Sequence, residues 1–124
     1  MNELAAREYP ILEYDPGPAV IEPAQIHTGK HWPDRLVMCY FAEQIKALVK
    51  SGQALRLDTF GSEAGPNPVY QLAGEPPLAL MHPGVGAPYA AAMLDEAIAC
   101  GARRVIVCGS GGVPSANSLT IAPQ

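Results

Sequence analysis

The segment from residue 78 to residue 108 constrains the fold of this chain more than any other part of the sequence. Leu78–Met81 and Val105–Val107 are short apolar runs of the kind that forms buried strands. Between them, apolar residues recur at helical spacing up to Gly101, which is a helix-ending residue. The members of this stripe are Ala90, Met93, Leu94, Ala97 and Ile98. A strand, a helix and a strand within about thirty residues predict a βαβ unit, whose two strands are parallel and end at one edge of the sheet.

The first third of the chain predicts an arm, a short strand and a helix. Residues 1–18 carry few periodic apolar positions and end in a Pro-Gly-Pro turn, and Ala19–Ile21 could form a first strand. From Asp34 onward, apolar residues follow at spacings of four, four and three, and Ser51-Gly52 closes the run. These residues are Val37, Phe41, Ile45 and Leu48. The pattern predicts an amphipathic helix from Asp34 to Gly52.

A hairpin is expected next. Ala54–Phe60 alternates the apolar Leu55 and Leu57 with the polar Arg56 and Asp58, as a strand with one solvated face does. Val69–Leu72 is the expected partner strand across a glycine- and proline-rich turn. Together with the βαβ unit, this predicts one α/β domain with a mixed sheet over residues 1–124.

Composition excludes several classes of function. Eight basic and twelve acidic residues give a net charge of -4, so no positive field is available to attract nucleic acid, and no apolar run is long enough to cross a bilayer. The three cysteines lie in apolar segments, which favours buried free thiols and a cytoplasmic location over a disulfide framework. His27, His31 and His82 are too dispersed to predict a metal site.

Two glycine-rich loops follow the two strands of the βαβ unit. The first is His82-Pro83-Gly84-Val85-Gly86-Ala87-Pro88, in which Pro88 suits the first turn of a helix. The second is Cys108-Gly109-Ser110-Gly111-Gly112-Val113. Ligands of open α/β sheets bind where such loops leave the carboxyl ends of strands, and the free N–H groups favour a phosphorylated or polar ligand.

These loops, together with Asp95-Glu96 and Gly101-Ala102-Arg103-Arg104, resemble the nucleoside phosphorylase and uridine phosphorylase family. The family is similar in having a Gly-x-Gly-x-Pro turn, an acidic helix, a Gly-Ala-basic turn, an apolar strand and a Gly-Ser/Thr-x-Gly loop in this order. A fainter similarity lies at Asp15-Pro16. The matches span residues 10–113 and are strongest in the last third of that range.

The resemblance implies a three-layer phosphorylase/hydrolase-like fold and transfer of a pentosyl group from a purine or pyrimidine nucleoside to phosphate. The products would be the free base and ribose 1-phosphate. By the resemblance, Ser110 and Gly84 would bind phosphate, and Gly111 and Gly112 would line the base and sugar pocket. It also implies inorganic phosphate as co-substrate, no further cofactor, and a homo-oligomer.

Three departures from the family leave alternatives open. Pro18 and Val107 stand where the family commonly has arginines, which favours an N-ribosyl hydrolase that uses water in place of phosphate. Arg35, Arg56 or a group from a neighbouring subunit could supply the missing charge. The family's later half is not represented after Val113, so we expect a truncated domain, and a non-catalytic fragment is a third possibility. A sheet that ends after Val107 would also expose an edge, which predicts self-association or marginal stability.

Overall fold

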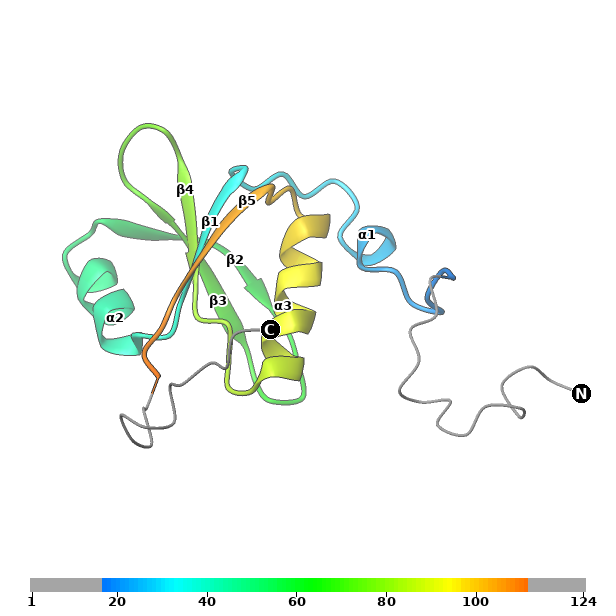
Figure 1. The fold of residues 1–124 in the computed structure, drawn as a ribbon. Helices are drawn as coiled ribbons and strands as arrows, with labels where there is room; N and C mark the ends of the chain where they lie inside the picture. Colours follow the sequence, from blue (N-terminus) through cyan, green and yellow to red (C-terminus); the bar gives the residue numbers. More distant parts are fainter. Residues whose placement is uncertain (1–16, 112–124) are drawn as a thin grey trace, which may run out of the picture.

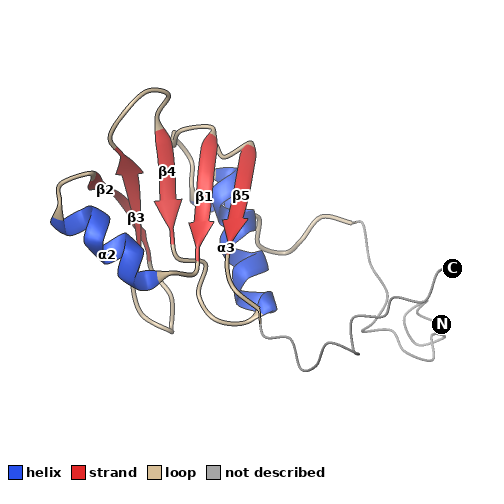
Figure 2. Ribbon diagram, turned by 60° about the vertical axis from the view of Figure 1, so that its left-hand side comes forward, coloured by secondary structure: helices blue, strands red, loops and turns tan. Residues whose placement is uncertain are grey.

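A computed structural model describes residues 17–111 of the 124-residue chain. It has an α/β fold built around a five-stranded mixed sheet in the order β2-β3-β4-β1-β5 (Figures 1 and 2). The strands are β1 (Arg35–Cys39), β2 (Ala54–Phe60), β3 (Asn67–Leu72), β4 (Leu78–Met81) and β5 (Arg104–Cys108). The helices are α1 (Pro23–Ile26), α2 (Ala42–Lys50) and α3 (Ala87–Ala99). The predicted α/β class and mixed sheet are therefore confirmed.

Strand β1 occupies an interior position of the sheet. It pairs in parallel with β4 through Leu36, Val37 and Met38, and with β5 along its whole length. The backbone N–H of Tyr40 extends the second ladder by donating to the carbonyl of Cys108 at 2.9 Å. Three parallel strands therefore end side by side at one edge of the sheet, which is the lower edge in Figure 2.

The predicted helix from Asp34 to Gly52 is wrong in its first half, because residues 35–39 form β1 and the helix begins only at Ala42. A parallel strand that is covered on both faces consists of consecutive apolar residues. One residue of β1, Val37, therefore lies four residues before Phe41 by chance, which is a helical spacing. Leu36, Met38 and Cys39 are buried, whereas Phe41 is 43% exposed. The helical stripe therefore joined residues from two different elements.

The βαβ unit is confirmed, and its strands have the expected bounds to within one residue. β4 and β5 are parallel, but they are not neighbours, because β1 lies between them. Pro88 lies in the first turn of α3, as expected. One member of the predicted stripe, Ile98, is 45% exposed, so the buried face of α3 is narrower than the sequence suggested.

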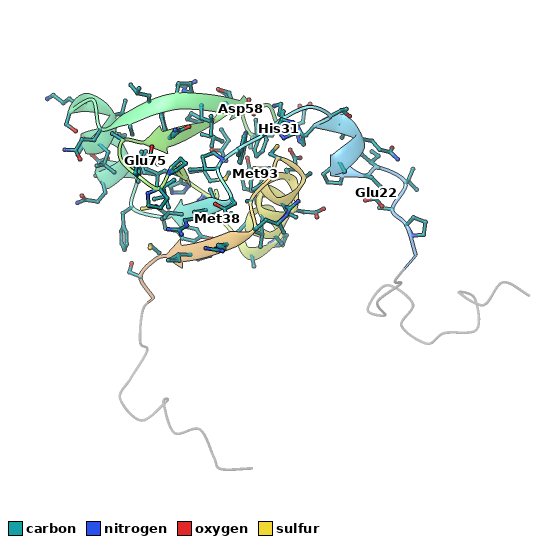
Figure 3. The ribbon with its side chains drawn as sticks, turned by 90° about the horizontal axis from the view of Figure 1, so that it is seen from above. Glu22, His31, Met38, Asp58, Glu75 and Met93 are labelled. Atoms are coloured by element: carbon teal, nitrogen blue, oxygen red, sulfur yellow. The ribbon has the colours of Figure 1, made fainter. Side chains whose placement is uncertain are left out.

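The two main helices lie on opposite faces of the sheet, α2 in front of it and α3 behind it in Figure 2. Alternate residues of β1 serve the two faces. Leu36 and Met38 belong to the larger core cluster with Met93 of α3, and Cys39 belongs to a smaller cluster with Ile45 of α2. Figure 3 shows Met38 and Met93 between β1 and α3.

The predicted hairpin is confirmed as β2 and β3, but its alternation is not. The β2–β3 register shifts between Arg56 and Asp58, which is a bulge at Leu57. Because one extra residue reverses the side on which each following side chain lies, Asp58 and Phe60 join Val69 on the α3 face. Leu55, expected to be inward, is 67% exposed.

The chain before β1 forms no strand at Ala19–Ile21, where Val20 and Ile21 are exposed. That prediction is wrong because three apolar residues have no neighbouring strand with which to pair. The segment packs instead through Trp32, whose backbone N–H donates to the carbonyl of Cys100 at 2.8 Å, beside Gly101. The predicted arm lies outside the described residues, apart from its last two.

Two truncations distinguish β1 from the helix that the sequence suggested. Leu36→Ala removes a side chain that is 1% exposed and should lower the free energy of unfolding by roughly 2–5 kcal/mol. Phe41→Ala should cost far less, since its ring is partly solvated, and Leu55→Ala is the control, with an expected change within about 0.5 kcal/mol. Urea unfolding measures all three; a larger loss for Phe41→Ala than for Leu36→Ala would contradict the strand.

Candidate functional site

The candidate site lies at the edge where β4, β1 and β5 end. The residues that follow these strands are His82, Tyr40 and Gly109, and they lie next to one another in strand order. The rings of Tyr40 and His82 meet edge to face with centroids 5.6 Å apart, and a Cβ on Gly109 would come within 3.1 Å of the Tyr40 ring. From β1 the chain passes through α2 to β2 at the far end of the sheet, returns through β3 to β4, and then crosses to β5 on the other side of β1. Open α/β sheets bind ligands where the direction of the connections reverses in this way.

Two open cavities flank this edge. The larger, of about 450 Å³, lies between the turn before β3 and the first turn of α3, and its lining includes Gly84 and Tyr89. The smaller, of about 190 Å³, lies beside α2. Three residues line both cavities: Asn67, Pro68 and His82. The larger cavity falls within the range of about 300–1,000 Å³ that is usual for small-molecule sites.

Gly84 is the one residue of the predicted set that lines the larger cavity. Its φ of +82° is a conformation that favours glycine, and a Cβ there would overlap the ring of Tyr89. Its N–H donates to Nδ1 of His82 at 3.0 Å. The N–H of Gly84, a residue that the family resemblance assigns to phosphate binding, is therefore already engaged by a side chain.

The other predicted residues lie apart from this cavity. Ser110 and Gly111 are exposed and line none of the cavities described here, and Gly112 lies outside the described residues. Tyr40 stands between their loop and His82. Their role as ligand-binding residues stays a prediction.

Neither arginine considered as a replacement reaches the edge. Arg35 begins β1, at the opposite end of that strand, and lines a separate depression with Arg104. The guanidinium of Arg56 donates to Thr59 Oγ1 at 2.9 Å and lies over the ring of Tyr70.

Among the described residues that line the larger cavity there is no Asp, Glu, Lys or Arg. Its lining consists of Ala64, Gly65, Pro66, Asn67, Pro68, His82, Gly84, Val85 and Tyr89. The smaller cavity, by contrast, is lined by the cationic side chain of Lys46, whose Nζ is 2.8 Å from Oε1 of Glu43. The hydrogen bond and negative charge of Glu43 hold the pKa of Lys46 above its ordinary value. The larger cavity therefore suits an uncharged polar ligand better than a phosphate.

A second group of polar side chains lies away from this edge, between β2 and the chain before β1 (Figure 3). Asp58 accepts hydrogen bonds from Lys30 Nζ at 2.8 Å, Trp32 Nε1 at 3.1 Å and the N–H of Thr59 at 2.8 Å. Burial alone would raise the pKa of Asp58, but these bonds and the charge of Lys30 outweigh it and lower that pKa. Because hydrogen bonds within the fold already satisfy the carboxylate, the group has a structural role. We refer to Lys30, Trp32 and Asp58 as the clamp.

Three further titratable side chains, those of His27, Glu96 and Cys100, also contribute to packing. His27 and Glu96 are 2.7 Å apart and join the chain after α1 to α3. Burial raises the pKa of the Cys100 thiol to about 11, so the thiol is protonated at neutral pH and is a poor nucleophile. No group of three possible metal-ligating side chains occurs within residues 17–111.

Sequence reasoning missed three residues of this edge, namely Tyr40, Asn67 and Tyr89. The sequence predicts that Asn67 lies in the glycine- and proline-rich turn of the hairpin, between residues 65 and 68. In the structure it is 9% exposed, and its amide donates to the carbonyl of His82 at 3.0 Å. An asparagine between two prolines was the available signal, because such a buried amide needs a specific partner. Nothing in the sequence indicated that Tyr40 or Tyr89 would lie beside His82 and Gly84.

The chain was compared with protein-family models, with curated proteins and with solved structures, and none of them matches. Among the helices of residues 17–111, none has the length and apolar composition needed to cross a bilayer.

Because the pKa of Asp58 in the clamp is lowered, we expect the free energy of unfolding to depend on pH. A carboxylate with a lowered pKa contributes stability that is complete above its unfolded-state pKa near 4 and is lost as pH falls through the folded-state value. Asp58→Asn should therefore cost roughly 1–3 kcal/mol at pH 7, and the difference from wild type should shrink toward pH 2. Urea unfolding across this range measures it. Asp34→Asn, at an exposed ion pair 3.9 Å from Arg104, is the control and should change little.

Proposed function

We propose that this chain carries a nucleoside-binding edge of the nucleoside phosphorylase type, acting in pentosyl transfer from a purine or pyrimidine nucleoside to phosphate. One observation carries the proposal. The two glycine-rich loops that resemble the family leave parallel strands β4 and β5, on either side of β1, at the same sheet edge, and the first of these loops lines a cavity of about 450 Å³. The three-layer phosphorylase-like fold belongs to this proposal.

The reaction would proceed by attack of a phosphate oxygen on the anomeric carbon of the sugar, with cleavage of the bond to the base nitrogen. The base leaves with the bonding electrons and takes up a proton, and the sugar becomes ribose 1-phosphate. Positive charge develops on the sugar in the transition state, and the adjacent phosphate stabilises it. The Ser110 hydroxyl would donate a hydrogen bond to phosphate, at an exposed position on the loop after β5.

A second candidate is an N-ribosyl hydrolase, in which water attacks in place of phosphate. It is favoured by the positions of the basic residues. Val107, where the family commonly has an arginine, is an exposed apolar residue of β5, and the charged groups of Arg35 and Arg56 lie elsewhere on the sheet. An uncharged nucleophile does not need these cations.

Release of free base from inosine and uridine, measured with and without phosphate, separates the two reactions. We expect release to require phosphate, and Ser110→Ala should raise the KM for phosphate by roughly tenfold, the loss of one hydrogen bond to an anion. Ser51→Ala removes the same hydroxyl from the end of α2 and should leave that KM unchanged. Equal release without phosphate would select the hydrolase, and no release would reject both.

The proposed homo-oligomer has a candidate interface at β5. Among the described strands, β5 pairs only with β1, and Ile106 and Val107 are 65% and 59% exposed on its two faces. Light scattering should show a mass above one chain that rises with concentration, and Ile106→Lys should lower it. Val20→Lys, at a fully exposed site outside the sheet, is the control. A monomer at every concentration would contradict the proposal.

A further inference from the structure

His82 is held in a single tautomer by the backbone. The N–H of Gly84 can only donate, so Nδ1 of His82, 3.0 Å away, must be the unprotonated acceptor. The neutral ring then carries its proton on Nε2. His82 therefore presents one hydrogen-bond donor beyond its contact with Gly84.

The orientation of the Asn67 amide follows from the same kind of argument. Its partner is the carbonyl oxygen of His82, 3.0 Å away, which can only accept, so the amide nitrogen must face it. The amide oxygen, Oδ1, is directed away from that contact. Asn67 therefore presents an acceptor in the cavity walls that it shares with His82.

Both atoms are open to a ligand. Within residues 17–111, neither His82 Nε2 nor Asn67 Oδ1 has a hydrogen-bond partner, while every fully buried side-chain nitrogen or oxygen there has one. Both atoms must therefore reach solvent, and both residues line the two cavities. A donor and an acceptor left unpaired in a largely apolar cavity wall are the arrangement by which pockets orient a ligand.

We propose that His82 and Asn67 form a donor–acceptor pair that binds the hydrogen-bonding edge of a nucleobase. The complement of this pair is a planar ring with a donor and an acceptor side by side, such as the N–H and carbonyl of uracil or hypoxanthine. The described lining of the larger cavity contains no Asp, Glu, Lys or Arg, which matches an uncharged base. Choosing a nucleobase among such rings rests on the proposed function.

Two tyrosine rings support a planar ligand, Tyr89 in the wall of the larger cavity and Tyr40 against the His82 ring. The Tyr89 ring packs on Gly84, and its hydroxyl is held by Ser62 Oγ at 3.3 Å. Tyr40 braces the His82 ring from the side of β1. Rings fixed in this way offer flat apolar surface at little entropic cost. The pair thus lies among surfaces against which a base can pack.

Two methylated uracils test the pair without altering the protein. In 1-methyluracil, the methyl group occupies the position of the sugar and leaves the N3–H edge free, whereas 1,3-dimethyluracil has no N–H donor on either edge. Titration of the full chain in phosphate-free buffer, followed by calorimetry or ligand-observed NMR, should show binding of uracil, hypoxanthine and 1-methyluracil. Binding of 1,3-dimethyluracil should be at least about tenfold weaker. Equal binding of the two methylated uracils, or no binding of any base, overturns the pair.

A protein variant provides the second arm. His82→Phe keeps a ring of similar size, removes the donor, and should weaken uracil binding by about tenfold or more. His31→Phe is the matched control on an exposed histidine, and thermal unfolding checks that both variants fold. Unchanged uracil binding by folded His82→Phe protein overturns the pair. Base binding with these dependences but no release from nucleosides would reject the proposed function alone. Release that is insensitive to His82 would reject the pair alone.

Discussion

The parallel pairing of β1 with both β4 and β5 is the interaction on which the rest of the structure depends. Leu36 and Met38 fill the core beneath α3, while Cys39 faces the smaller cluster beneath α2, so this strand joins the two cores. The same pairing brings the carboxyl ends of three strands together. Because β4 reaches β5 only by crossing β1, the loops after these strands flank the residue that follows β1, Tyr40.

The bulge at Leu57 has a comparable effect on the chain before β1. Without it, Asp58 and Phe60 would share the face of Arg56 and lie on the α2 side of the sheet. With it, Phe60 stacks on Trp32 with centroids 5.0 Å apart, and Asp58 accepts the indole N–H and the ammonium group of Lys30. One extra residue in β2 thereby secures the segment that leads into β1.

The candidate site owes its polarity to backbone groups rather than to charges. The N–H of Gly84 and the carbonyl of His82 each engage one side-chain atom, and in doing so they determine which atoms of His82 and Asn67 remain available. Such a site recognises shape and hydrogen-bonding pattern, and a buried mismatch is what makes it selective. This agrees with a cavity wall built from small, aromatic and proline residues, in which a charged group would lack compensation.

Local pattern alone determined the elements of this fold that are contiguous in sequence. The hairpin at residues 54–72 and the βαβ unit at residues 78–108 were predictable, because the turn of the hairpin and the apolar runs, helical spacing and glycine loops of the βαβ unit each lie within one stretch of sequence. The same loops placed Gly84 at the sheet edge. Only the tertiary structure decided that Leu36–Cys39 is a strand, that Asp58 turns inward, and that Asn67 meets His82. Each of these features depends on a partner far away in the chain. The local sequence around a residue does not indicate which distant groups will pack against it or form its hydrogen bonds.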